Sequence, residues 1–226
     1  MTRLKFSLAV TGLLLVVVPR SLRTEKPHPL PLIFQEDFEK GATHWAPKDP
    51  TGWKVKKTKS GQVYSQFKKD SSYQPPHRSP FHVSLIKDVL VGDFELTVQV
   101  RSTHEDYGHR DVCLFLGFQD SAHFYYVHLG KKTDDHANQI FIVNEKPRIK
   151  ISHKTTSGTN WDDQWHTVKI VRRIKDGLIS VYFDDLQHPI MLAKDQTFSW
   201  GKVGLGSFDD TGDWDNLQLR GIRVKK

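Results

Sequence analysis

The sequence predicts an all-β protein, folded as an antiparallel two-sheet sandwich. Runs in which apolar and polar residues alternate recur along the chain, and turn residues separate them at a spacing of about ten residues. No stretch of about a dozen residues shows a convincing 3.6-residue apolar period, so helix should be minor. The 226 residues, 37% of them hydrophobic, can bury a sizeable core. We therefore expect one ordinary domain.

The chain begins with the layout of a secretory signal peptide over residues 1–23. Two basic residues precede the apolar run Leu8–Val18, which is much shorter than the ~20 residues of a membrane-spanning helix. We expect a secreted or periplasmic protein with no stable membrane span after leader removal; a permanent membrane anchor is the weaker alternative. Residues 24–32 are Pro-rich and predict a stiff connector. The domain is expected over residues 33–226.

Charge and cysteine content exclude several classes of partner and site. The formal net charge is +7, but the leader contains four basic residues and no acid, so its removal lowers the charge to +3. The remaining Lys and Arg alternate with acids and form no sustained basic stripe, and we expect no nucleic-acid partner. The single cysteine, Cys113, excludes an intramolecular disulfide, Cys-cluster zinc sites and iron–sulfur centres.

Eight runs predict strands, and the clearest lies at 93–101. Its apolar residues face one way and its polar residues the other, as in a half-buried strand. The turn at Lys175-Asp176-Gly177 predicts a hairpin between the sixth and seventh runs. The eight predicted strands are Asp93–Arg101, Val112–Gln119, His123–Leu129, Gln139–Val143, Arg148–His153, His166–Arg172, Leu178–Asp184 and Leu217–Val224.

Successive side chains of a strand point to opposite faces of the sheet, so the parity of a residue's position predicts whether its side chain points toward the core or away from it. If the strands at 93–101, 112–119 and 123–129 are neighbours in one sheet, Arg101, Tyr126 and His128 lie side by side on it. Polar groups around flat aromatic rings suit a sugar. The alternative is that these residues form the ordinary polar face that every alternating strand has, without any contact to a ligand. The residues of the second and third strands that suit the core are Leu114, Leu116, Phe118, Tyr125, Val127 and Leu129.

Several segments, in this order, resemble the concanavalin A-like jelly-roll superfamily, in the form of LamG-like and 3-keto-disaccharide hydrolase-like domains of secreted bacterial proteins. The resemblance covers roughly Phe34 to Val224. It implies a jelly roll of two curved sheets whose concave face binds or processes carbohydrate. The segments that carry it are Phe34–Glu39, Gly92–Leu96, Trp165–Ile170, Gly177–Asp184, Gly201–Gly206 and Asp213–Asn216.

The densest polar cluster is His104–Asp111, in a loop between two predicted strands, where binding residues concentrate. His109, Arg110 and Asp111 could supply a base, an anion-stabilising cation and an orienting acid. The alternative is a solvated loop in which an Arg–Asp pair holds the turn. His109 and His128 are the candidates for a catalytic base. The predicted ligand-binding residues are Arg101, His109, Arg110, Tyr126, His128 and Asn138.

Acids near the two ends of the domain predict a structural calcium. The first and last strands of a jelly roll usually pair, which would bring Glu36 and Asp37 close to Asp215. Carboxylate and backbone oxygens converging there suit calcium, which takes 6 to 8 oxygen ligands. The alternative is that these side chains satisfy backbone amides in a turn.

The predicted function is recognition of a poly- or oligosaccharide on the concave face of an exported jelly-roll domain. One alternative is a glycoside-processing enzyme resembling the 3-keto-disaccharide hydrolases, with His109 or His128 as the base. Another is a structural or adhesive module that displays its loops to a protein. Glycosidase catalysis by paired carboxylates has little support, because the Glu-x-Asp-x-x-Glu strand of this superfamily's sandwich glycosidases is absent.

Overall fold

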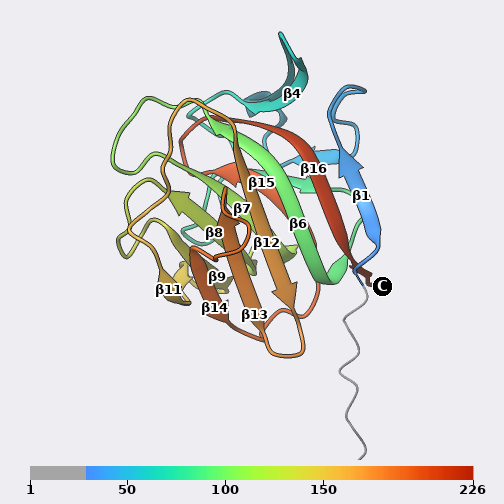
Figure 1. Cartoon of the computed structure of the whole chain (residues 1–226), viewed down its shortest axis with the longest axis vertical. Helices are drawn as coiled ribbons and strands as arrows, with labels where there is room; N and C mark the ends of the chain where they lie inside the picture. Colours follow the sequence, from blue (N-terminus) through green and yellow to red (C-terminus); the bar gives the residue numbers. More distant parts are fainter. Residues whose placement is uncertain (1–28, 226) are drawn as a thin grey trace, which may run out of the picture.

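A computed structural model describes residues 29–225, so the predicted leader and most of the predicted connector lie outside the described part of the chain. Two antiparallel sheets pack face to face, which confirms the predicted all-β sandwich (Figure 1). The described residues form sixteen strands, one 3-10 turn at Pro50–Gly52 and no α-helix. Among these residues, no helix is long and apolar enough to cross a membrane.

The larger sheet has nine strands and lies in front in Figure 1. Its central strands, β6 and β16, pair along most of their length, from Gly212 opposite Ser102 to Arg223 opposite Val91. In order across the sheet the strands are β11 (Ser152–Thr155), β14 (Met191–Lys194), β13 (Leu178–Phe183), β12 (His166–Arg173), β6 (Val91–Ser102), β16 (Gly212–Arg223), β4 (Gly61–Gln66) and β3 (Trp53–Thr58), and β1 (Leu32–Glu36) also pairs with β16.

The second sheet has seven strands, and β7 and β8 near its centre carry most of the residues discussed below. Cys113 lies directly opposite His128 in this pair. In order across the sheet the strands are β10 (Ile149–Lys150), β9 (Gln139–Asn144), β8 (His123–Gly130), β7 (Asp111–Asp120), β15 (Lys202–Ser207), β5 (His82–Ile86) and β2 (Trp45–Pro47).

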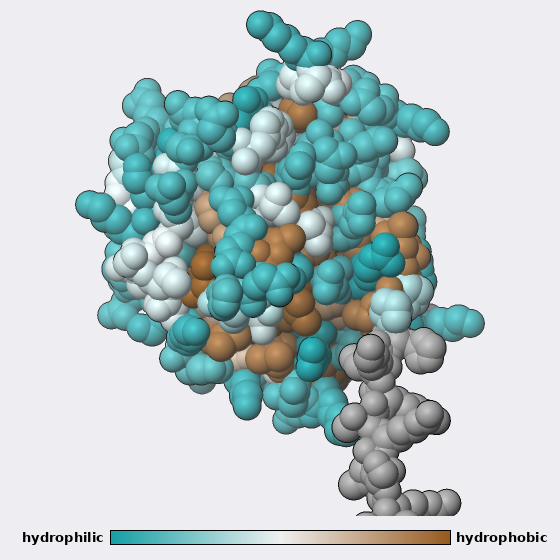
Figure 2. All heavy atoms as spheres, in the orientation of Figure 1, coloured by the Kyte–Doolittle hydropathy of each residue, from teal (hydrophilic) through white to brown (hydrophobic). Residues whose placement is uncertain are grey.

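The main core lies between the sheets and is built from one face of each strand. On β6 the residues Phe94, Leu96, Val98 and Val100 are almost fully buried, as alternation predicts. The neighbouring polar residues of β6 are half-buried on the outer face, and Figure 2 shows hydrophilic side chains over most of this side of the molecule. The core-facing residues of β7 and β8 include Leu114, Leu116, Tyr125, Val127 and Leu129, all predicted correctly.

A second buried cluster, which we call the outer aromatic cluster, covers the other face of the seven-stranded sheet. Phe118 belongs to it, so its predicted place in the main core is wrong. Gly117 has a positive φ of 59°, and the β7–β8 register shifts between Leu116 and Asp120, which turns Phe118 to the side of Phe115. The cluster comprises Val83, Leu85, Cys113, Phe115, Phe118, Phe124, Tyr126, Phe141, Val143 and Phe208.

Two predictions about strands need correction. The run predicted at 148–153 divides into β10 and β11, which belong to different sheets. The strand at 93–101 is β6 of the nine-stranded sheet, whereas β7 and β8 belong to the seven-stranded sheet. Arg101 therefore does not lie beside Tyr126 and His128. The other predicted strands are confirmed within a few residues, and none of the eight predicted runs corresponds to β1, β2, β3, β4, β5, β14 or β15.

Candidate functional site

A pocket of about 470 Å³ lies over the outer aromatic cluster, and we call it the outer pocket. Its floor comes from strands β7 and β8, and its rim from the loops that follow β4, β6, β8, β9 and β15. Loops over a rigid sheet are the usual place for binding residues. The lining residues are Arg78, Phe81, Tyr107, His109, Asp111, His128, His136, Arg148, Phe208 and Asp209.

The floor of the outer pocket is a buried histidine beside a buried carboxylate. His128 and Asp111 are 4% and 3% exposed, and Nε2 of His128 lies 2.8 Å from Oδ2 of Asp111. Neither ring nitrogen of His128 has an aligned hydrogen bond to any described residue. The close approach of the two groups is therefore an ion-pair geometry without a directed N–H bond.

Cys113 completes a group of three at this floor. It lies on β7, two residues after Asp111 and on the same face of the strand, and its Sγ is 4.0 Å from Oδ1 of Asp111. Burial raises the pKa of the Cys113 thiol well above its ordinary value, and the carboxylate of Asp111 adds to this. Arg148 opposes this shift without cancelling it, so the thiol is neutral.

Aromatic rings and one arginine form a wall of the outer pocket. The Phe208 ring lies 5.5 Å from the His128 ring, and Tyr126 stacks on Phe141 at 5.0 Å. Arg148 lies over the rings of Phe141 and Phe208 and donates a hydrogen bond of 2.9 Å to the Tyr126 hydroxyl. Tyr126 itself is fully buried, so a ligand would meet Phe208 and Arg148 before it.

An acidic corner borders the floor. Asp210 accepts hydrogen bonds of 2.7 Å from the Tyr107 hydroxyl and from the backbone N–H of Asp111. Burial, followed by the charge of Asp111, raises the pKa of Asp210 to about 6. Burial and Asp210 together raise the pKa of the Tyr107 hydroxyl, so this hydroxyl acts as a hydrogen-bond donor.

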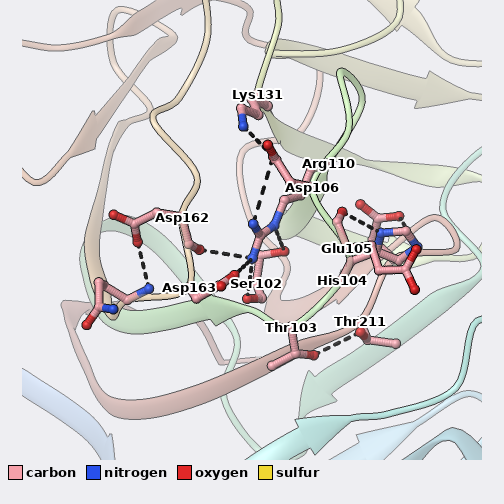
Figure 3. A network of polar contacts seen from close by, with 12 residues as sticks. Ser102, Thr103, His104, Glu105, Asp106, Arg110, Lys131, Asp162, Asp163 and Thr211 are labelled. Atoms are coloured by element: carbon pink, nitrogen blue, oxygen red, sulfur yellow. Dashed lines mark hydrogen bonds and ion pairs between the residues drawn. The ribbon is translucent and has the colours of Figure 1, made fainter.

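Arg110 is directed into the protein and not into the outer pocket (Figure 3). Its side chain is 2% exposed, and the guanidinium donates to Ser102, to the Asp162 carbonyl and to the Asp163 carboxylate at 2.8 to 3.0 Å. These bonds tie β6 to the loop before β12. The structure does not bring His109, Arg110 and Asp111 together, because His109 faces Asp134 at 3.2 Å.

The two remaining predicted ligand-binding residues, Arg101 and Asn138, lie outside the lining of the outer pocket. Arg101 is on the nine-stranded sheet, where it donates to Asp213 at 2.7 Å and lies over Trp165. Asn138 is fully buried with a positive φ of 53°, and its Nδ2 donates to Thr133 at 2.7 Å. Of the six predicted residues, the structure brings His109 and His128 to the lining of the outer pocket.

The acids predicted to bind calcium lie where the first and last strands pair. Glu36 is opposite Leu217 in the β1–β16 ladder, and Glu36 and Asp37 line a separate pocket of about 370 Å³. Burial raises the pKa of Asp215, and the nearby Glu39 and Asp37 add to this. Each predicted ligand also accepts a nearby backbone N–H, such as that of Phe38 for Glu36. The calcium site stays a prediction.

The sequence did not indicate that Tyr107, Arg148 and Phe208 line a site, or that Asp111, Cys113 and His128 form one group. Parity does place Cys113 and His128 on the outer face, which was the available signal. Their approach depends on the β7–β8 register, which puts the two residues opposite each other. Phe208 and Arg148 reach the site from loops whose course no local pattern specifies.

No family model and no curated protein matches this chain. Solved structures do resemble it. The carbohydrate-binding module CBM66 from Bacillus subtilis is 16% identical, with a TM-score of 0.56 over 79% of this chain and 96% of that one. A Bacillus subtilis protein of unknown function with a galectin-like fold is 10% identical, with a TM-score of 0.60 over 88% and 99%.

Winged bean acidic lectin, solved with methyl-α-D-galactose, is 12% identical, with a TM-score of 0.59 over 85% of this chain and 98% of the lectin. At such identities the likeness concerns the fold alone. Together with the two antiparallel sheets, it confirms the expected architecture. The chain folds as a concanavalin A-like jelly-roll sandwich.

Proposed function

We propose that this chain is an exported jelly-roll domain that binds a poly- or oligosaccharide in the outer pocket. The main support for this function is the pocket itself, in which exposed polar side chains surround an aromatic wall on one face of the seven-stranded sheet. The likeness to a carbohydrate-binding module and to a lectin solved with a galactoside supports this choice.

The lining matches the two chemical faces of a sugar. A pyranose ring has an apolar C–H face, for which Tyr107, a 40%-exposed residue of the lining, offers a flat ring, whereas Phe208 is 9% exposed and lies under Arg148. Its hydroxyl edges need donors and acceptors, and the exposed His109 and His136 and the half-buried Arg148 supply them. A volume of about 470 Å³ falls in the usual range for small-ligand sites.

Glycan-array binding, with product analysis on every hit, tests this function. His136→Ala removes an exposed polar group of the rim, and we expect affinity for the best glycan to fall about tenfold with unchanged thermal stability. The matched control is His188→Ala, because His188 is an exposed histidine outside the pocket lining. An array without hits, or equal losses in both variants, contradicts the proposal.

A glycoside-processing enzyme is the second candidate, and the His128–Asp111 pair at the pocket floor favours it. A histidine beside a carboxylate can accept a proton from substrate. Release of product from a bound glycan or keto-glycoside, with loss of release in His128→Gln, would select this candidate. Binding without turnover would select the lectin-like function.

Export and calcium are separate parts of the proposal. Fractionation of cells that express a tagged chain tests export, with recovery outside the cytoplasm expected. For calcium, chelator-treated protein should show a raised melting temperature when calcium is restored, and Asp215→Asn should reduce this rise. Absence of both binding heat and a thermal shift contradicts the calcium site.

A further inference from the structure

Three side chains of the types that ligate metals meet under the outer pocket. Within residues 29–225, Asp111, Cys113 and His128 are the one set of three or more His, Cys, Asp or Glu side chains whose ligand atoms all lie within 4.8 Å of one another. All three are buried, and their positions are fixed by the pairing of two central strands. A rigid sheet holds ligands more precisely than loops do.

The distances between these side chains lie on either side of those in a tetrahedral metal site. Zinc binds sulfur, nitrogen and oxygen at about 2.0 to 2.3 Å, so its ligands lie about 3.3 to 3.7 Å apart. Here Nε2 of His128 and Oδ2 of Asp111 are 2.8 Å apart, and Sγ of Cys113 is 4.0 Å from Oδ1 of Asp111. Shifts of about 0.5 Å or less would bring both separations into the tetrahedral range.

The bonding of His128 supplies an independent observation. Its two ring nitrogens are buried, and neither makes an aligned hydrogen bond to a described residue, although Nε2 lies 2.8 Å from Oδ2 of Asp111. A buried imidazole is normally hydrogen-bonded, as His166 is to Asp184 and Asp162 at 2.8 and 3.1 Å. His128 is 4% exposed, so its ring nitrogens have little contact with bulk water.

We infer that Asp111, Cys113 and His128 bind one zinc-class divalent transition metal ion. A thiolate, an imidazole and a carboxylate together favour zinc over the hard ions calcium and magnesium, which take oxygen ligands. Three protein ligands leave a fourth position, as in catalytic zinc sites. Because Asp111 and His128 line the outer pocket, this position is reached from the pocket.

Metal binding has a defined proton balance. The neutral thiol of Cys113 loses its proton to solvent when its sulfur binds the ion, so one proton is released per metal bound at this ligand. His128 would then be a metal ligand and not a free base. The inference does not depend on glycan binding, and the two are measured separately.

Cobalt provides a specific probe. Metal-free protein titrated with Co²⁺ should develop a sulfur-to-cobalt charge-transfer band in the near ultraviolet, with one equivalent bound. Cys113 is the chain's only cysteine, so this band reports on Cys113 alone, while the other 11 histidines cannot produce it. Zn²⁺ should displace the cobalt and abolish the band.

Variants test the ligand set. Cys113→Ala should abolish the band, and Asp111→Asn and His128→Gln should each weaken binding by more than about 100-fold, since even outer-sphere partners change affinity 10–100-fold. His188→Ala, at an exposed His–Asp pair elsewhere, should bind cobalt as wild type does. If a ligand variant does not fold, the wild-type titration still decides. Absence of the band from folded wild-type protein overturns the inference.

Discussion

The outer faces of the two sheets differ in what covers them. On β6 of the nine-stranded sheet, outer residues such as Glu95 and Thr97 are half-buried. On β8 of the seven-stranded sheet, Phe124, Tyr126 and His128 are at most 4% exposed. Both strands alternate with the same period, yet only β6 alternates between core and partial solvent exposure.

The seven-stranded sheet therefore carries an additional layer on its outer face. Tyr73 and Phe81, from the segment between β4 and β5, pack on the outer aromatic cluster together with Phe208. This layer makes a cavity possible where an uncovered sheet would be flat. It also buries polar groups such as Asp111 and His128, whose chemistry then departs from that of surface residues.

The largest effect should come from truncating the outer aromatic cluster. Parity places Phe115 on the outer face of β7, away from the main core. In the structure it is nevertheless fully buried, between Phe118, Phe124 and Tyr126. Phe115→Ala should lower the free energy of unfolding by about 3 to 5 kcal/mol, measured by urea denaturation.

Thr97→Ala, on the outer face of β6, is the control for this truncation and should cost less than about 1 kcal/mol. Similar losses in the two variants would mean that the outer aromatic cluster contributes no more than an ordinary sheet surface. Tyr126 is also fully buried, so Tyr126→Ala should lose stability in the same measurement. A loss of glycan affinity in that variant would then reflect folding and not a direct contact with the ligand.

Arg110 should give the next largest effect, on stability and not on glycan affinity. Replacing it with Met keeps much of the apolar stem but leaves the Ser102 and Asp162 carbonyls without this donor. We expect a loss of about 2 to 3 kcal/mol in the free energy of unfolding, because hydrogen bonds from a charged group are lost. Unchanged stability with weakened glycan binding would instead restore Arg110 as a ligand-binding residue.

Local pattern predicted the strands and the face of each side chain, because alternation is a property of a few consecutive residues. Tyr125, Val127 and Leu129 follow it into the main core. The sheet neighbours could not be predicted this way, so β6 was grouped with strands of the other sheet. The covering layer was also missed, because it depends on where loops return, and no period records that.

The last prediction contrasts two buried aspartates as pH changes. Burial opposes the charge of Asp213 on the nine-stranded sheet, yet the ion pairs with Lys56 and Arg101, both 2.7 Å, lower its pKa. Asp213 therefore stabilises the fold above the unfolded-state pKa of 3.8, and this contribution is lost as pH falls through its lowered folded-state pKa.

Asp210, beside the outer pocket, should behave in the opposite sense. Its folded-state pKa is raised to about 6, against 3.8 in the unfolded chain. As pH rises from 3.8 to about 6, the unfolded state loses this proton before the folded state does, so the free energy of unfolding falls across that window. Urea denaturation of Asp210→Asn between these pH values should show a flatter slope than wild type. Asp213→Asn should keep the fall near pH 5 and lose stability mainly above pH 4, and the reverse pattern would contradict the assignment of the two environments.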